Sequence, residues 1–522
     1  METDKQEWLV EIPEQPVAEK RPAPRGAAKL KPIDRSQGLL RTVIVDELVG
    51  PDHKARAMWE LTGRWDLSGL IDRVKSEAGK AGRAAWNPRL LLSVWLYGYS
   101  EQVTSAREIE RLMEYEPGLM WLSGLGEVNH HTLSDFRADN QEELKKLLGE
   151  LLGLLSAEGF LTLELVAHDG VKIRAQVGAD TFRREATLER EIAQAQRMVE
   201  ELERQGDSEP ESHRRRQAAR QRAARERSGR LQLAVKELEK IREGRRTGAE
   251  REQARVSLTE PEARLMKHGD NAIAPSYNLQ LSTDAANNII VGMHLTQSSS
   301  DSGALLPAME EVKQTLGQYP RAVVADGGFT NRASIGEMQE HGMEFYGSMS
   351  EPAARQAAAM QAAGIDPAFG PSFFTVNAEN QTLQCPAGKT LRYVRQSKKR
   401  DDLYHPYQAQ AGDCGTCGFQ KQCCPKHPEQ GRLVSIRMTE NAQVSEFREK
   451  MKTEEAKKIY KRRGPVAEFP NAWIKEKLGI RKFRLRGMRK AAAEALWGVL
   501  TYDVMQWLRL SWKPKRAAAM AA

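Results

Sequence analysis

The segments LELVAHDGVKIR (residues 163–174) and RAVVADGGF (residues 321–329) decide the fold of this chain. In each segment a run with β-branched and other apolar residues is followed by Asp-Gly, which predicts a strand with a carboxylate at its exit. Glycine after the aspartate lets the backbone turn sharply and leaves room for a metal ion or a phosphate. Asp-Gly is also common in plain turns, so either segment alone is equally consistent with a turn of no further function.

The surrounding sequence predicts the rest of a sheet. Residues 276–297, SYNLQLSTDAANNIIVGMHLTQ, have the pattern of a β-hairpin with its turn at residues 284–288. A capped helix, the strand that precedes Asp326, a second helix and a further strand follow. Three antiparallel strands and then strand-helix alternation predict an α/β fold of the RNase H-like kind, a mixed five-stranded sheet with helices. Because the first and fourth strands of that fold run side by side, we expect Asp169 and Asp326 to meet.

A third carboxylate stands in YKRRGPVAEFPNAWIK (residues 460–475). Residues 450–490 contain fifteen Lys or Arg against four Asp or Glu, so this part of the chain suits a polyanion, which Glu468 alone would repel. A divalent metal ion resolves the conflict. Two Mg²⁺ (or Mn²⁺) ions about 3.5–4 Å apart, held by carboxylates, activate the attacking oxygen and stabilise the leaving oxygen in phosphodiester chemistry. We therefore expect a catalytic, metal-binding triad of Asp169, Asp326 and Glu468.

This set of motifs resembles the Asp-Asp-Glu triad of bacterial insertion-sequence transposases. The third segment is similar to the lineage with a Tyr-Arg-Glu-Lys signature, insertion-sequence group 1182, with Tyr460, Arg463, Glu468 and Lys475 at the signature positions. The likeness runs from about residue 45 to about residue 510. Phe329 stands where the family usually has Tyr, and the segment between the signature Glu and Lys is unusual.

The resemblance implies a DNA transposase that cuts the ends of its insertion sequence and joins the freed 3′-hydroxyl to target DNA. Tyr460, Arg463 and Lys475 would bind phosphates near the transferred end. The implied partners are double-stranded DNA, as terminal inverted repeats and target, and a second copy of the chain in a homodimer. Two alternatives remain, a nuclease of the same fold without strand transfer and a catalytically silent DNA-binding relic of a transposon.

The N-terminal part of the chain predicts a tail followed by helices. Residues 1–44 are rich in Pro, Lys, Glu and Ala, which is typical of a disordered tail. Residues 45–158 predict an all-helical module. Within it, NHHTLSDFRADN (residues 129–140) resembles the second helix of a helix-turn-helix, with Thr132 as N-cap and Arg137 pointing outward to DNA. An ordinary helical bundle explains the same pattern, and the family resemblance favours DNA-end binding.

The catalytic core is expected in two parts, residues 159–373 and 434–510, with Glu468 in the C-terminal helices and a tail at 511–522. Residues 181–255 interrupt the first part with dense Arg, Glu, Gln and Ala. Apolar residues recur every three or four positions over residues 188–202 and every seven over residues 224–238, with a break at residues 205–212. That pattern predicts an antiparallel helical hairpin. We expect it to be a solvated strut or a dimer contact, because such charge usually faces solvent.

The cysteines form a separate cluster. All five lie within residues 385–424, which argues against a chain-wide disulfide framework. Four thiolates at about 2.3 Å would make a closed structural zinc site. The preferred ligands are Cys385, Cys414, Cys417 and Cys423. Cys424 or His427 could replace one of these ligands. The cluster belongs to a Cys-rich insertion, residues 374–433, and the alternative is that its thiols bind no metal.

Overall charge and hydropathy narrow the class of protein. The chain has 79 basic and 71 acidic residues, a formal net charge of +8, which weakly favours an anionic partner. No apolar signal segment is present, and the longest apolar run, near residues 90–99, is too short to cross a bilayer. We expect a bacterial cytoplasmic protein associated with the nucleoid and not with a membrane.

Overall fold

The structure, a computed structural model, describes residues 42–76, 84–205, 214–349, 352–377, 380–399, 402–438 and 441–512. The tails expected at residues 1–44 and 511–522 lie almost wholly outside these ranges. The described residues belong, apart from the first three, to one compact unit that starts at Val45. None of the helices in this described part is both long and apolar enough to cross a lipid bilayer.

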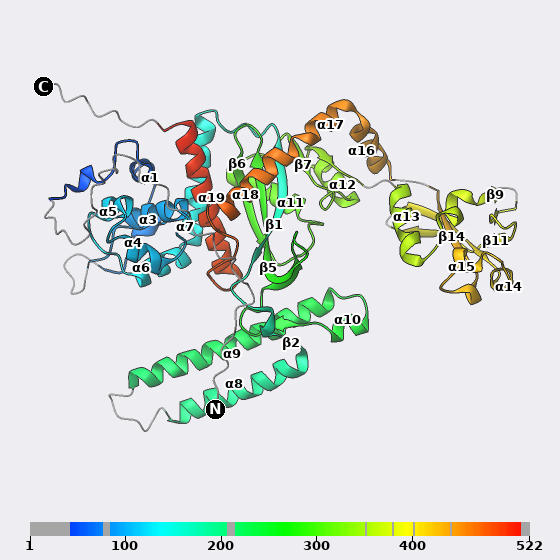
Figure 1. The fold of residues 1–522 in the computed structure, drawn as a ribbon, viewed down its shortest axis with the longest axis horizontal. Coiled ribbons are helices and arrows are strands. Elements are labelled where there is room, and N and C mark those ends of the chain that lie inside the picture. The colour runs from blue at the N-terminus through cyan, green and yellow to red at the C-terminus, as the bar shows by residue number, and fades with distance from the viewer. Residues whose placement is uncertain are drawn as a thin grey trace, which may run out of the picture. The chain divides into compact units, whose positions relative to one another are not determined.

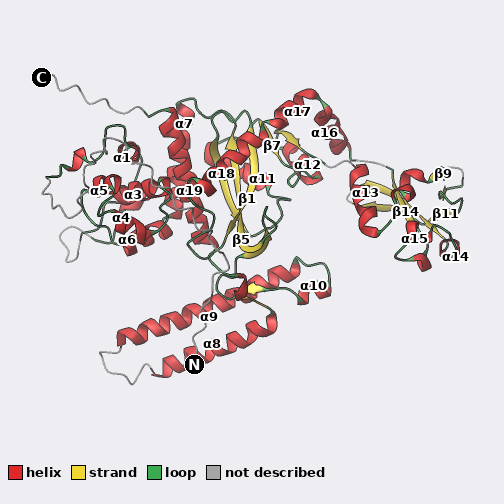
Figure 2. Cartoon of the chain, viewed as in Figure 1, coloured by secondary structure: helices red, strands yellow, loops and turns green. Residues whose placement is uncertain are grey.

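The described residues between 45 and 157 form helices only (Figures 1 and 2). The helices are α1 (Lys54–Thr62), α2 (Ser68–Ile71), α3 (Pro88–Ser100), α4 (Ala106–Leu112), α5 (Pro117–Ser123), α6 (His130–Asp139) and α7 (Gln141–Ala157), after a short 3₁₀ turn at Val45–Glu47. Helix α3 starts at Pro88, where a missing N–H costs nothing, and the Asn87 side chain accepts a hydrogen bond from the Arg89 N–H. The side chains of α3 are almost all buried.

A mixed six-stranded sheet forms the centre of the chain (Figure 2). Its strands are β1 (Val166–Arg174), β4 (Arg264–Lys267), β5 (Ile273–Asp284), β6 (Ile289–Thr296), β7 (Ala322–Ala325) and β8 (Glu344–Gly347). The order is β4-β5-β1-β7-β8, and β6 pairs with the remaining part of β5. Strand β1 runs parallel to β7, with His168 opposite Ala325. The expected pairing of the first and fourth strands is thus confirmed, and β4 makes the sheet one strand larger than predicted.

Strand β1 does not end at Asp169, as the sequence analysis expected. It continues through Gly170 to Arg174 in antiparallel register with β5. Val171 and Ile173 are buried and continue the alternation of the strand, so their contribution to the core keeps the backbone extended. The first Asp-Gly pair is therefore part of a strand, whereas the second follows the end of β7.

Helices cover both faces of this sheet. The helices are α11 (Leu305–Leu316), α12 (Arg332–Glu340), α16 (Ala442–Lys452), α17 (Glu454–Lys461), α18 (Phe469–Glu476) and α19 (Met488–Leu510). Successive residues of β7 alternate between two apolar clusters, Val323 in the larger and Val324 in the smaller. The smaller cluster joins the sheet to α17 and to the turn before α18 through Ala456, Val466 and Ala467.

Two long antiparallel helices lie in the insertion after β1. Its elements are β2 (Phe182–Arg183), α8 (Glu185–Gln205), α9 (Arg214–Glu243), α10 (Gly248–Glu252) and β3 (Val256–Ser257), after a 3₁₀ turn at Ala179–Thr181. Ion pairs connect Arg225 to Glu203 at 2.9 Å and Arg227 to Glu191 at 2.7 Å. The later residue of α9 pairs with the earlier residue of α8, so the two helices are antiparallel.

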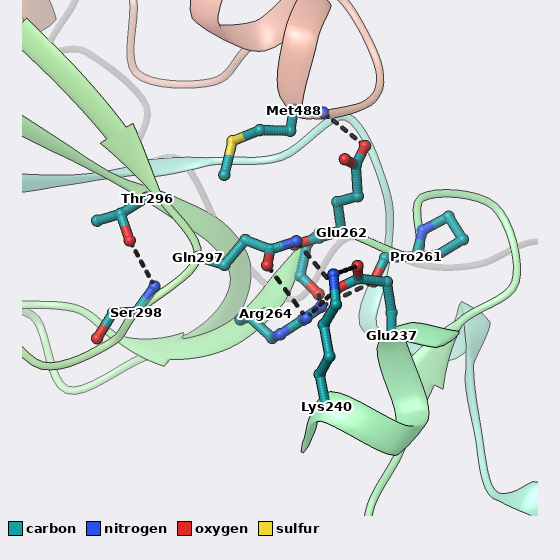
Figure 3. Close-up of polar contacts among 10 residues, drawn as sticks. Glu237, Lys240, Pro261, Glu262, Arg264, Thr296, Gln297, Ser298 and Met488 are labelled. Atoms are coloured by element: carbon teal, nitrogen blue, oxygen red, sulfur yellow. Dashed lines mark hydrogen bonds and ion pairs between the residues drawn. The ribbon is translucent and has the colours of Figure 1, made fainter. Parts of the chain in front are cut away.

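A buried carboxylate anchors this hairpin to the sheet. Glu237 of α9 is 2% exposed and forms an ion pair with Arg264 of β4, while Gln297 at the end of β6 donates to it at 3.1 Å (Figure 3). Gln297 also donates to the Glu262 backbone oxygen at 3.0 Å, and the Met488 N–H at the start of α19 donates to the Glu262 side chain at 2.7 Å. One network thus joins α9, β4, the end of β6 and α19.

The Cys-rich part forms a second, antiparallel sheet that the sequence analysis did not predict. Its strands are β9 (Thr375–Asn377), β10 (Thr382–Gln384), β11 (Thr390–Tyr393), β12 (Ser397–Lys399), β13 (Asp402–Ala409) and β14 (Leu433–Arg437). The helical elements around it are α13 (Pro352–Ala363), α14 (Ala411–Gly415) and α15 (Gln420–Cys423), with 3₁₀ turns at Pro367–Phe369, Pro371–Phe373 and Pro428–Gln430. Leu383, Leu391 and Val434 form its small core.

Candidate active site

The first and second predicted carboxylates lie on neighbouring parallel strands. His168 of β1 is opposite Ala325 of β7, so Asp169 and Asp326 follow the last paired positions, on strands about 4.8 Å apart. The Asp169 Oδ1 atom accepts a hydrogen bond from the Gly170 N–H at 2.9 Å, and the Asp326 Oδ1 atom accepts one from the Gly328 N–H at 2.7 Å. The sheet thus brings two of the three predicted carboxylates together.

Asp169 is held from helix α18 as well. The Asn471 Nδ2 atom donates to the Asp169 Oδ2 atom at 3.0 Å. Asn471 is 9% exposed, and its Oδ1 atom is buried without a hydrogen-bond partner among the described residues. Burial raises the pKa of Asp169 to about 6, the negative charges of Asp326 and Asp301 add to that rise, and Arg463 opposes it.

The third predicted carboxylate follows an unusual turn. Gly464–Glu468 form a π-helical turn between α17 and α18. In an α-helix, residues five positions apart lie about 140° apart around the axis, whereas an i→i+5 turn brings them to one face. Arg463 and Glu468 are five positions apart and form an ion pair, Nη2 to Oε1, at 3.7 Å. The Glu468 side chain is 69% exposed.

The Glu468 side chain does not lie together with those of Asp169 and Asp326. Val466 and Ala467, just before it, pack in the same apolar cluster as Ala167 of β1, so its backbone lies against the strand of Asp169. Within the described ranges, however, no three His, Cys, Asp or Glu side chains are close enough to hold a metal ion. The donors that are present, carboxylates and the unpaired amide oxygen of Asn471, are the hard oxygen ligands that suit Mg²⁺ or Mn²⁺.

The basic and aromatic signature residues surround this region. Arg463 and Lys475 both lie within electrostatic reach of Asp169. Burial lowers the pKa of Lys475, and the positive charge of Arg481 adds to this effect, while Glu476, Asp169 and Asp270 oppose it. Tyr460 is half-buried and packs on the smaller apolar cluster, next to the turn that carries Glu468.

His168, next to the first aspartate, is a core residue. It is fully buried and hydrogen-bonded to the Ser282 and Gln280 side chains, each at 3.0 Å. The Phe329 ring meets it edge-on, with 4.8 Å between ring centroids. Burial lowers the pKa of His168 to about 4, so the imidazole is neutral at physiological pH.

The prediction that Arg137 points outward to DNA is wrong. Arg137 is 4% exposed, its Nη1 atom donates to the Thr104 backbone oxygen at 2.6 Å, and its guanidinium lies 4.7 Å from the centre of the Trp95 ring. Buried Glu494 of α19 supplies the opposite charge nearby. Thr132 is not the N-cap of α6 either, because Asn129 has that position.

The cysteines surround one small cavity of about 20 Å³, which all five of them line. The Cys385 Sγ atom accepts a hydrogen bond from the Lys389 N–H at 3.2 Å, and the Cys414 Sγ atom accepts one from the Arg432 N–H at 3.3 Å. Burial raises the pKa of Cys423 to about 11, Arg432 opposes the shift, and the neighbouring thiols add to it. The thiols are neighbours, although the described residues do not include a closed set of metal ligands.

Sequence reasoning did not find two residues of this region, Asn471 and Asp301. Asn471 stands in the unusual segment between the signature Glu and Lys, and its polar side chain among apolar neighbours is the only signal for it. Asp301 lies in SSSDSG (residues 298–303), just before α11, which the sequence predicted as a capped helix. The N-cap position of α11 is Ala304, and no side chain caps the helix there. No pattern of spacing connects Asp301 to either Asp-Gly motif.

Two models of known protein families match separate parts of the chain. Residues 384–507 match a family model described as Transposase DDE domain, and residues 43–139 match one described as Transposase domain (DUF772). The first match includes the cysteines, Glu468 and Lys475, whereas Asp169 and Asp326 precede it. No curated protein matches the chain.

These two matches support a DDE transposase of the insertion-sequence type. A DDE domain implies an RNase H-like core, and the mixed sheet with its helices is consistent with that fold. The class acts on DNA and generally uses divalent metal ions.

Proposed function

We propose that the chain is a DNA transposase of the lineage with the Tyr-Arg-Glu-Lys signature, insertion-sequence group 1182. It cleaves DNA at the ends of its insertion sequence and transfers the freed strand into target DNA. The observation that carries this proposal is the pair Asp169 and Asp326 on neighbouring parallel strands. Asp169 lies within electrostatic reach of Arg463 and Lys475. Carboxylates beside cationic side chains suit a reaction in which a charged phosphoryl group must be held and stabilised.

The cofactor that suits this donor set is a pair of Mg²⁺ or Mn²⁺ ions, with Asp169, Asp326 and Glu468 as ligands. When bound, the ions would activate the attacking oxygen and stabilise the leaving oxygen. Glu468 is exposed, and its contact with Arg463 is long at 3.7 Å. A rotamer change, which takes nanoseconds or less at the surface, is enough to reorient its carboxylate. Asn471 keeps Asp169 in one orientation meanwhile.

The DNA partners are the terminal inverted repeats of the element and the target duplex. Arg463 and Lys475 would bind phosphates of the transferred end, the guanidinium by two parallel hydrogen bonds and the ammonium as a point charge. Tyr460, beside them, would contact the same backbone. The two ends are held by a homodimer, and the helices of residues 45–158 contact DNA through groups other than the buried Arg137.

One structural Zn²⁺ ion is proposed for Cys385, Cys414, Cys417 and Cys423. The common cavity and the two backbone N–H groups that donate to sulfur support it, because such hydrogen bonds orient and stabilise metal-bound thiolates. Metal analysis of protein purified without chelator should give one equivalent of zinc. A clearly lower amount would leave a metal-free thiol cluster.

The deciding experiment is incubation of the purified protein with the DNA that flanks its gene and Mg²⁺, followed by sequencing of all broken and joined ends. Joined products that disappear in Glu468→Gln would support the transposase. Asp326→Asn should retain binding to the DNA ends and lose cleavage, because the change removes one charge and keeps the shape of the side chain.

Two other outcomes would lead to different functions. Defined cuts without joining would make the protein a nuclease of the same fold. Binding without any metal-dependent cut would make it a silent DNA-binding relic. Loss of both binding and folding in Asp326→Asn would assign that residue a structural role.

A further inference from the structure

Asp301, a carboxylate outside the predicted triad, lies against both Asp-Gly motifs. It stands in the loop between β6 and α11, on the N-terminal side of α11. Its Oδ1 atom accepts hydrogen bonds from the Asn278 Nδ2 atom at 2.8 Å and from the Gln280 Nε2 atom at 2.9 Å. Both amides belong to β5 and are 1% exposed. Two buried donors to one oxygen fix the orientation of this carboxylate.

The lack of a side chain at Gly170 leaves room for this carboxylate, and Gly328 lies beside it. A Cβ atom on Gly170 would lie 2.6 Å from the Gln280 Nε2 atom and 2.7 Å from the Asp301 Oδ1 atom, distances that real Cβ atoms essentially never show. A Cβ atom on Gly328 would lie 3.6 Å from the other oxygen, Oδ2, and 3.0 Å from the Asp326 Oδ1 atom. Because β1 does not turn at Gly170, a sharp turn does not explain this glycine, whereas the close approach of the hydrogen-bonded Gln280 amide and Asp301 carboxylate does.

Two buried oxygen atoms of this region, the Oδ1 atoms of Asn278 and Asn471, have no hydrogen-bond partner among the described residues. Their Nδ2 atoms donate to Asp301 and to Asp169. The Asp301 Oδ2 atom accepts neither of the two amide hydrogen bonds, because both go to Oδ1. Buried polar atoms are normally paired with protein, water or an ion. The negative charge of Asp301 also reaches Asp169, where it adds to the rise in pKa.

We propose that Asp301 is a positioning residue for the metal-binding pair. Its carboxylate packs against Gly170 and lies beside Gly328, so it supports the placement of the two Asp-Gly motifs, and its Oδ2 atom would accept hydrogen bonds from water molecules bound to the divalent ions. This inference rests on the proposed function of Asp169 and Asp326 as metal ligands. It adds a fourth carboxylate that acts through the other residues and does not touch the DNA.

The test compares the wild-type chain with Asp301→Asn and with a control, Glu310→Gln, which removes an exposed carboxylate nearby on α11. Asparagine retains an oxygen for the two buried amides, so the fold is expected to persist. Mn²⁺ binding to the full-length protein is measured by calorimetry, together with the Mg²⁺ concentration for half-maximal cleavage, the affinity for end DNA and the melting temperature.

We expect Asp301→Asn to weaken Mn²⁺ binding and raise the required Mg²⁺ concentration by about 10-fold or more, the range found for groups that orient metal ligands. DNA affinity and melting temperature should stay at wild-type values, and Glu310→Gln should match the wild type throughout. A second variant, Asp301→Ser, retains an acceptor for one amide and should show the same metal defect.

Equal Mn²⁺ affinity of wild type and Asp301→Asn, with cleavage by the wild type intact, would overturn this inference and leave the proposed function standing. Parallel losses of melting temperature, DNA affinity and metal affinity in both variants would overturn it too, since they would indicate a purely structural residue. A wild-type protein that neither binds Mn²⁺ nor cleaves DNA would overturn the proposed function itself.

Discussion

Asp169→Asn is expected to stabilise the metal-free protein at alkaline pH while it abolishes metal binding. The folded protein raises the pKa of this carboxyl from 3.8 to about 6, so the ionised form is less compatible with the fold than the protonated form. The ionised carboxylate therefore lowers the free energy of unfolding. This destabilisation is full above pH 6, decreases as the pH falls through 6, and is absent below about pH 4. Asparagine, which cannot ionise, removes it.

The magnitude follows from the shift and the contacts. A difference of about two pKa units corresponds to about 3 kcal/mol, and solvent screening of this partly exposed side chain reduces the figure to about 2 kcal/mol. Asparagine can still accept the Asn471 hydrogen bond, but it turns its amide toward the Gly170 N–H and loses that hydrogen bond, at about 1 kcal/mol. The net gain of about 1 kcal/mol corresponds to about 2–4 °C in Tm for a domain of about 150–250 residues.

Thermal melts at pH 8 and pH 5, with EDTA and with millimolar Mg²⁺, provide the measurement. At pH 8 in EDTA the variant should melt above the wild type, and at pH 5 the gain should shrink. Mg²⁺ should raise the Tm of the wild type only, because binding to the native state alone stabilises it. Asp180→Asn, an exposed carboxyl, serves as control. A lower Tm for Asp169→Asn at pH 8, or an equal effect of Mg²⁺ on both proteins, would refute the reasoning.

Three further predictions concern binding and stability. Lys475→Ala should weaken DNA binding and make the plot of log affinity against log salt shallower by about 0.9, one phosphate contact; an unchanged slope would remove Lys475 from the DNA interface. Arg137→Ala should destabilise the fold by about 3–5 kcal/mol in denaturant titrations, because it removes a buried positive charge near Glu494 together with the hydrogen bond to the Thr104 oxygen, and should not alter the DNA affinity of the folded protein. Glu237→Ala should leave the Arg264 guanidinium unpaired, lower stability by about 2–3 kcal/mol and speed proteolysis of the helical hairpin, whereas Lys240→Ala, which removes only the exposed partner, should do neither.

The core of the fold was predictable because its signals are local. Alternating and β-branched runs mark strands wherever one face is buried, and the hairpin turn at residues 284–288 separates β5 from β6 as expected. The pairing of β1 with β7 followed from the order of strands and helices. The extra strand β4 was not predictable, because only four residues pair with the extended first half of β5.

The candidate site was only partly predictable, because several of its contacts join distant parts of the sequence. The position of Asp301 depends on hydrogen bonds from amides of β5 and on contacts with glycines of β1 and of the loop after β7. The sequence of its own loop does not indicate these contacts. Asn471 meets Asp169 across 302 positions of sequence. Arg137 has the charge of a surface residue, yet it is buried, and the negative charge nearby is that of Glu494 on α19. Sequence periodicity identifies the apolar face of a helix, but it does not reveal a buried charge whose partner is far along the chain.

The π-helical turn at Gly464–Glu468 has a consequence for recognising relatives of this chain. Such a turn accommodates one extra residue without changing the rotation of the helices on either side. A homologue with one residue fewer would form an ordinary α-helical turn there, and its Arg and Glu, four positions apart, would still share a face. A motif search that fixes the interval between Arg463 and Glu468 would therefore miss homologues whose sites are equivalent. An alignment of such homologues needs a single-residue gap in this turn.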